Sequence, residues 1–94
     1  MKLTPIASNM TEVETSEARI LFSYRTPVAA YVFGEGFVRT EKWYSVTTSR
    51  HINKWVDGGT AKEVAQTYLD ILVLGVIMNI STSIFLYILI IILL

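Results

Sequence analysis

The sequence predicts a small α+β domain, in which an antiparallel β-hairpin or meander packs on a short helix. A long C-terminal helix that becomes a single transmembrane span is expected to follow. Three observations support this prediction. Two β-prone runs flank a glycine-containing turn at residues 34–36, and a run of Ser and Thr at residues 45–49 precedes a stripe with helical spacing. The last 24 residues, Ile71–Leu94, carry no charge.

Length and composition limit the classes of protein that this chain can form. With 94 residues and a formal net charge of 0, it is one small domain at most, which excludes a large multi-domain enzyme. The absence of cysteine excludes a disulfide scaffold and a zinc module with Cys ligands. We expect no secretory signal peptide, because residues 1–10 contain no apolar run of the needed length.

The uncharged residues 71–94 form a hydrophobic C-terminal tail. The residues before this tail are predicted to form a flexible N-terminal arm, residues 1–17, and a small α+β head, residues 18–70. The arm is rich in Thr, Ser and Glu and shows no sustained strand or helix period. Ala18–Arg25 then alternates, with Ile20 on one face and Leu21 on the other, which predicts the first strand.

A β-hairpin is predicted around the turn Gly34–Gly36, whose glycines accept the positive φ that a tight turn requires. The β-prone runs Val28–Phe33 and Phe37–Tyr44 lie on either side of it. Thr26 and Pro27 separate the first run from the preceding strand, because proline cannot donate to a strand ladder.

A short helix is predicted at about Arg50–Asp57, after the Ser and Thr hydroxyls of residues 45–49, which can cap its first turn. Its inner stripe has the spacing i, i+3, i+4 and consists of Ile52, Trp55 and Val56. Gly58 and Gly59 are expected to end the helix through a left-handed residue.

A second helix is predicted from Ala61, because Thr60 and Glu63 have the spacing of a capping box. No glycine or proline interrupts the chain between this box and Asp70, so the helix is expected to continue directly into the uncharged tail.

The tail, residues 71–94, would be about 36 Å long as a helix, against a hydrocarbon core of about 30 Å. We therefore expect it to contact membrane lipid as a single-pass anchor. The head would be cytosolic, because Lys54 and Lys62 precede the span and no Lys or Arg follows it. Two alternatives are a packing helix buried against the head and an accidental C-terminal extension.

The residues give no indication of catalysis, and we expect no cofactor and no metal ion. His51 is the only histidine, and the acidic residues show no ligand spacing. The hydroxyls at Ser45–Ser49 beside His51 are better explained by helix capping than by a nucleophile. The chain also has no glycine-rich phosphate loop.

One stretch is basic: from Arg39 to Lys54 there are four cations against a single acid, Glu41. Such a stretch favours an anionic partner. The candidate anion or nucleic-acid contacts are Arg39, Lys42, Arg50, His51, Asn53 and Lys54. Aromatic side chains of the hairpin could stack on unpaired bases, or they could form the core of the unit. These are Tyr31, Phe33, Phe37, Trp43 and Tyr44.

Three segments, Thr26–Val32, Gly36–Thr40 and Ser45–Trp55, together resemble a family of short viral and bacteriophage proteins that carry a domain of unknown function. The shared pattern is a Thr-Pro-Val-Ala strand, a glycine turn and a Tyr-Ser-x-Thr-Thr-Ser-x-His-Ile-Asn-x-Trp helix start. The resemblance implies a small accessory protein with a β-hairpin and a helix, and it assigns no activity. The apolar tail departs from this pattern.

Two functions follow as hypotheses. The first is a non-enzymatic accessory protein of a virus or bacteriophage, anchored in a membrane by residues 71–94, with a cytosolic head for an unidentified protein partner. The second is a small nucleic-acid-binding module whose apolar tail is accidental or a packing helix. A head of this size has a marginal core, so an oligomer is compatible with both.

Overall fold

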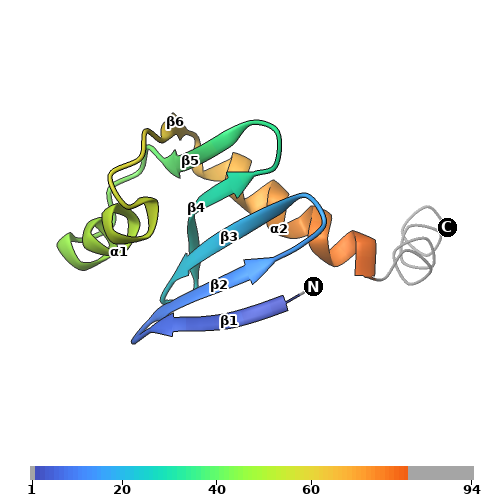
Figure 1. Ribbon diagram of the computed structural model, residues 1–94, viewed down its shortest axis with the longest axis horizontal. Coiled ribbons are helices and arrows are strands. Elements are labelled where there is room, and N and C mark those ends of the chain that lie inside the picture. Colours follow the sequence, from blue (N-terminus) through green and yellow to red (C-terminus); the bar gives the residue numbers. More distant parts are fainter. Residues whose placement is uncertain (1, 81–94) are drawn as a thin grey trace, which may run out of the picture.

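The computed structural model describes the backbone of residues 2–80 and the side chains of residues 2–75. Six strands form one sheet in the order β1-β2-β3-β4-β5-β6 (Figure 1). The first five strands are an antiparallel meander, and β6 is parallel to β5. The elements are β1 (Lys2–Ala7), β2 (Met10–Glu14), β3 (Ala18–Ser23), β4 (Thr26–Val32), β5 (Gly36–Thr40), α1 (Val46–Val56), β6 (Lys62–Val64) and α2 (Gln66–Ile80).

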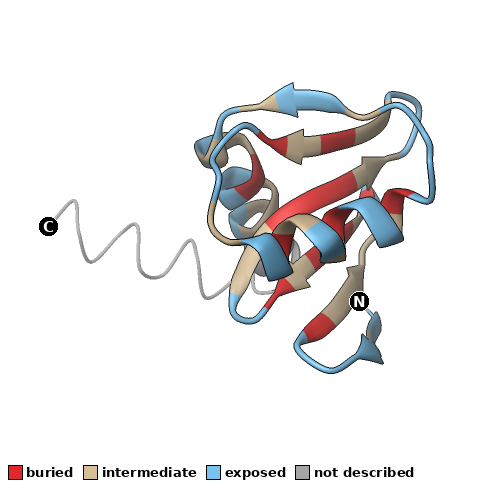
Figure 2. Ribbon diagram, turned by 90° about the vertical axis from the view of Figure 1, so that its left-hand side faces the viewer, coloured by how far each residue is buried: buried red, intermediate tan, exposed pale blue. Residues whose placement is uncertain are grey.

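Each of the two helices covers a different face of this sheet. Ile20 and Leu21 are neighbours on β3, and both are at most 1% exposed. Leu21 belongs to a cluster that contains Ile52 of α1, whereas Ile20 belongs to a cluster that contains Leu69 of α2. We call these two faces the α1 side and the α2 side. Figure 2 shows the buried residues on the central strands and on the helices that cover them.

The hairpin predicted at the glycine turn is present and joins β4 to β5. Val32 is paired with Gly36, and Gly34 and Gly36 have φ values of 87° and 105°. On β4 the small residues Ala29 and Ala30 point to opposite faces, and both are fully buried. Small side chains at this position let a helix approach the sheet closely from either side.

The prediction of a flexible arm at residues 1–17 is wrong, because this part of the chain forms β1 and β2. Val13 pairs with Ile20 of β3, and Met10 is only 2% exposed because it packs into the α1-side cluster. Asn9 takes a left-handed φ of 61° in the turn between the two strands. The polar character of β1 and β2 reflects their place near the edge of the sheet, where few side chains are buried.

The first helix begins earlier than the sequence predicts, at Val46 rather than Arg50. Ser45 is its N-cap, and the Ser45 hydroxyl accepts a hydrogen bond from the Thr48 backbone N–H at 3.1 Å. The cap at the other end is Asp57, which is left-handed and precedes the two glycines.

The second helix begins at Gln66 and not at Ala61, and Lys62–Val64, within and just after the predicted capping box, forms the edge strand β6. Thr40 pairs with Val64, and the Glu41 N–H donates to the Val64 carbonyl at 2.8 Å. Pairing with the open edge of β5 and packing of Val64 on the α2 side outweigh the local capping pattern.

Within residues 2–80, the prediction of a long C-terminal helix that becomes a transmembrane span is also wrong. The helix α2 has 15 residues, and no helix within residues 2–80 is long and apolar enough to cross a bilayer, which takes about 20 apolar residues. Leu72 and Val73, at the start of the predicted span, pack against the sheet. The predicted membrane location, lipid contact and cytosolic orientation depended on that span. Residues 81–94 of the predicted tail lie outside the described residues.

Two polar contacts hold α2 on the sheet. The Gln66 side-chain amide donates to the Pro27 carbonyl at 2.7 Å, next to the start of β4. Two residues further along the helix, the Tyr68 hydroxyl donates to the Glu35 carboxylate, in the β4–β5 turn, at 3.4 Å. Burial, followed by the charge of Glu35 and this hydrogen bond, raises the pKa of Tyr68 above its ordinary value of 10.0.

The two sides of α2 should respond differently to truncation. Leu69 is fully buried, so Leu69→Ala should lower the free energy of unfolding by about 2–5 kcal/mol. Leu74 lies on the same helix but is 55% exposed, so Leu74→Ala should change it by about 0.5 kcal/mol or less. Urea unfolding followed by circular dichroism measures both. Equal losses of stability in the two variants would contradict the described orientation of α2.

The raised pKa of Tyr68, caused first by burial and then by Glu35, should make stability depend on pH in the alkaline range. The pKa of Tyr68 is higher in the folded chain than in the unfolded chain, so the stabilisation is complete below the ordinary pKa and is lost as the pH rises through the raised one. Removing the Glu35 charge in Glu35→Gln should lower the pKa of Tyr68. Tyrosinate absorbance, corrected with Tyr68→Phe, measures this, and Glu14→Gln is the control. If the midpoint of the Tyr68 titration is the same in wild type and in Glu35→Gln, Glu35 does not contact Tyr68.

Candidate functional site

Arg50 and Lys54 lie on the side of α1 that points away from the sheet. The buried residues of this helix are Thr48, Ile52 and Val56, all on the opposite side. Because residues four apart share one side of a helix, the two cations form a short exposed row. This is the basic pair that the sequence predicts.

Arg39 and Asn53 are brought together by the fold although they are distant in sequence. The Arg39 guanidinium donates from Nη1 to Oδ1 of Asn53 at 3.0 Å, at the surface. The hydrogen bond holds the cation of β5 against the flank of α1. It also uses the Asn53 carbonyl oxygen, which leaves the amide NH₂ group to donate elsewhere.

Lys42 is exposed in the loop that joins β5 to α1. Its ammonium group lies 5.0 Å from the centre of the Tyr44 ring, within the range of a cation–π contact. The Tyr44 ring itself packs against the α1-side cluster. Burial, and to a smaller extent the charge of Asp70, raises the pKa of this tyrosine.

His51, the remaining charged or titratable candidate, points inward rather than outward. Its Nδ1 lies 2.7 Å from the hydroxyl of Ser23, at the end of β3. The same hydroxyl lies 3.0 Å from that of Thr48, which is buried on α1. The imidazole ring is also tilted against the ring of Tyr24, at a centroid distance of 6.0 Å. His51 therefore links α1 to the sheet through its hydrogen bond with Ser23.

A serine hydroxyl within hydrogen-bond distance of an imidazole is the arrangement of a catalytic nucleophile and its base. Ser23 and His51 could act in this way only if a substrate could reach the serine oxygen. Ser23 is only 2% exposed, and Thr48, its other partner, is 6% exposed. A substrate carbonyl cannot reach an oxygen that is enclosed between strand and helix. The arrangement is suited to holding structure and not to attacking a substrate.

The aromatic residues expected to stack on bases are divided among different environments. A series of edge-to-face contacts runs through four aromatic rings. The distances between ring centroids are 6.0 Å from Phe33 to Tyr31, 4.8 Å from Tyr31 to Phe37 and 5.5 Å from Phe37 to Trp55. Trp55 is fixed further, because its indole N–H donates to Glu12 at 3.0 Å. Tyr31 and Phe37 are accordingly packing residues on the α1 side.

The two aromatic candidates whose side chains are exposed to solvent are Trp43 and Phe33. Trp43 is 69% exposed, and Phe33 is 44% exposed. Trp43 lies between Lys42 and the start of α1, where Val46 is also exposed, at 58%. Phe33 lies at the opposite end of β5, beside Glu35. We define the α1 outer surface as Arg39, Lys42, Trp43, Val46, Arg50, Asn53 and Lys54.

Within the described residues, the cations of the α1 outer surface form no ion pair. A salt bridge joins Arg19 to Glu12 at 3.9 Å, on the neighbouring part of the sheet. Within residues 2–75, no carboxylate forms such a bridge with a cation of the α1 outer surface. The positive charge of this surface is therefore available to an anion.

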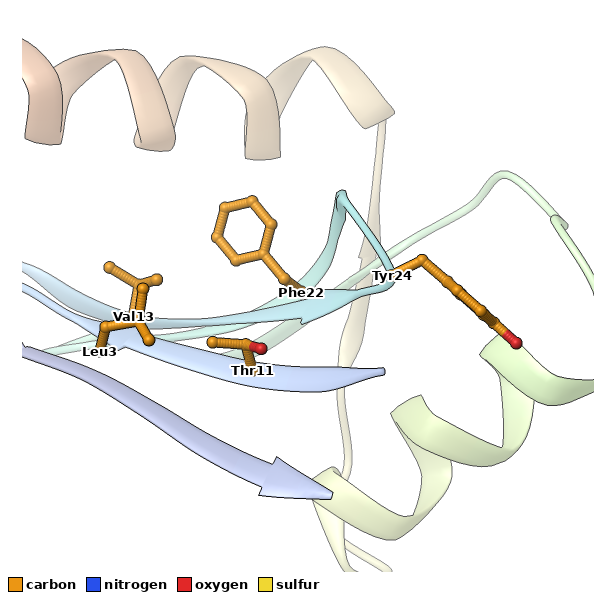
Figure 3. A pocket seen from close by; sticks show the side chains of 5 residues that line it. All are labelled: Leu3, Thr11, Val13, Phe22 and Tyr24. Atoms are coloured by element: carbon orange, nitrogen blue, oxygen red, sulfur yellow. The ribbon is translucent and has the colours of Figure 1, made fainter. Parts of the chain in front are cut away.

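The α2 side carries a groove of about 230 Å³, which Figure 3 shows between strands β1–β3 and a helix. Its lining is mostly apolar, with Phe22 projecting from β3 toward the helix. The residues that line it are Leu3, Thr11, Val13, Phe22 and Tyr24. Among these described residues, the polar side chains are the hydroxyls of Thr11 and Tyr24, which do not form an acid–base pair. In the described part of the chain, no three His, Asp or Glu side chains gather as a metal site.

The sequence model of a family of unknown function (DUF8033) matches residues 1–71. The chain belongs to this family. The match includes all six strands and the complete α1 outer surface. No curated protein and no solved structure matches the chain. The family match carries no indication of source, so the viral or bacteriophage origin implied by the resemblance stays a prediction.

The sequence did not reveal the contacts of Ser23 and Glu12. Their partners, His51 and Trp55, lie 28 and 43 residues away along the chain. The alternation of β3 does place Ser23 and Leu21 on one face. Only the position of α1 shows that this face meets His51, and no local pattern contains that information.

The structural role of Ser23 can be tested by removing its hydroxyl. In Ser23→Ala the buried Thr48 hydroxyl and His51 Nδ1 lose their partner, which should lower the free energy of unfolding by about 1–3 kcal/mol. The exposed Ser16→Ala should change it by about 0.5 kcal/mol or less. Thermal unfolding of both variants provides the comparison. A Ser23→Ala variant as stable as wild type would show that this hydroxyl does not fasten α1.

Proposed function

We propose that this domain is a non-enzymatic module that binds nucleic acid through the α1 outer surface. The observation that carries the proposal is the exposed pair Arg50 and Lys54, unpaired within the described residues, with Arg39 held beside them by Asn53. A nucleic-acid strand matches such a row of separated cations, because each cation can bind one of its successive phosphate groups.

The hydrogen bond between Arg39 and Asn53 supports the proposal in a second way. A free arginine side chain loses rotamer freedom when it binds, whereas Arg39 is already held in one arrangement. Its guanidinium has five N–H donors, so it can keep the bond to Asn53 and still donate to a phosphate.

The absence of catalysis is part of the same proposal. The Ser23–His51 pair lies between sheet and helix, and the groove on the α2 side is lined by apolar residues and hydroxyls. Neither offers an acid and a base that face a substrate. An accessory role in a virus or bacteriophage is a further proposal, supported by the sequence pattern of β4, β5 and α1.

The binding test compares two variants with the same change in net charge. Arg50→Ala with Lys54→Ala removes the cations of α1, and Lys2→Ala with Lys62→Ala removes exposed cations of β1 and β6. Fluorescence anisotropy of a labelled oligo-dT strand gives the affinity over a series of salt concentrations. The slope of log affinity against log salt should become shallower by roughly 1.4 in the α1 variant, at about 0.7 for each phosphate that the protein no longer neutralises.

The control variant, Lys2→Ala with Lys62→Ala, should keep the slope of the wild type, because its cations lie outside the α1 outer surface. An affinity that does not depend on salt would disprove the proposal. Equal changes of slope in both double variants would also disprove it, because binding would then follow net charge and not this surface.

A further inference from the structure

We infer that Trp43 stacks on an unpaired base, which makes single-stranded nucleic acid the ligand class of the α1 outer surface. The inference rests on the proposed function and adds the form of nucleic acid that is bound. It separates strands with accessible bases from duplexes, whose bases are paired and stacked inside the helix.

Trp43 has the exposure that base stacking requires. At 69% it is the most exposed of the large apolar side chains of residues 2–75. Within these residues the indole takes part in no hydrogen bond and no ring pair. Trp55, by contrast, is tied to Glu12 and to Phe37. The Trp43 ring is therefore open to a planar partner.

The backbone around Trp43 is fixed although its side chain is exposed. On one side the Lys42 N–H donates to the Thr40 hydroxyl at 3.1 Å. On the other side the Tyr44 ring packs on the α1-side cluster, and Ser45 caps the helix. Because its neighbours are anchored, the backbone at Trp43 is already ordered, so that stacking costs only the rotamer freedom of the indole side chain.

The position of Trp43 relative to the cations favours a strand with free bases. It follows Lys42 directly and precedes the first turn of α1, whose outer side continues to Arg50 and Lys54. A single strand with its phosphates along these cations can turn one base toward the indole ring. Stacking of one base on an aromatic side chain strengthens binding by about 1–3 kcal/mol and tolerates any base.

Phe33 provides a matched control, since it is an exposed aromatic residue in a different electrostatic setting. It is 44% exposed at the turn between β4 and β5. Glu35 lies in the same turn, and the Phe33 N–H donates to the backbone carbonyl of Glu17. Two carboxylates in this region disfavour a phosphate strand, so Phe33 should not contribute to binding.

The experiment measures the affinity of the full chain for three labelled probes: oligo-dT, an abasic strand of the same length and a duplex. Trp43→Ala should weaken oligo-dT binding by between about 5-fold and 150-fold. It should leave the abasic strand and the duplex within about twofold of wild type. Trp43→Phe should recover most of the missing affinity, and Phe33→Ala should bind oligo-dT as wild type does. Circular dichroism confirms that each variant is folded.

Other results would overturn the inference. If Trp43→Ala weakens all three probes equally, or none of them, Trp43 does not stack on a base. In that case the salt dependence of Arg50→Ala with Lys54→Ala still decides the proposed function separately. If none of the probes binds in a salt-dependent way, both proposals fail, and an exposed tryptophan beside cations would fit an acidic protein partner instead.

Discussion

The structure depends on one constraint, which is that the central strands β3 and β4 are apolar on both faces. Ile20 and Leu21 are adjacent and point to opposite sides, and both are excluded from solvent. A strand of this kind is stable only if each face of the sheet is covered, because burial of apolar surface contributes about 25 cal/mol for each Å². The helix α1 covers one face, α2 covers the other, and β1, β2 and β6 extend the sheet on both sides of the central strands.

The same constraint determines which residues of α1 remain exposed. Once Ile52 and Val56 are buried on the sheet, Arg50 and Lys54 must point away from it, because a helix cannot turn both sides inward. His51 lies at the boundary between the two sides, and its contact with Ser23 takes it out of the exposed row. Exposed cations and packing residues are thus separated by residue position on a single helix.

The sequence predicted elements that are determined by neighbouring residues. The hairpin at Gly34–Gly36 and the capping of α1 by hydroxyls are of this kind, since the turn and the cap need only residues nearby. Pairings between distant residues were not predicted. Strand β6 is stabilised by the edge of β5, more than twenty residues earlier, so Thr60 and Glu63 gave a false capping signal. The exposure of Trp43 and the burial of Tyr31 and Phe37 also depend on the position of α1.

Amide chemical-shift mapping tests whether nucleic acid binds at the α1 outer surface. ¹H–¹⁵N spectra recorded during a titration with oligo-dT locate the bound strand without any substitution. If the strand binds at this surface, the largest changes will occur at the Trp43 indole N–H and at the amides of Arg50, Asn53 and Lys54. Changes confined to the groove of β1–β3 or to the turn at Phe33 would contradict it.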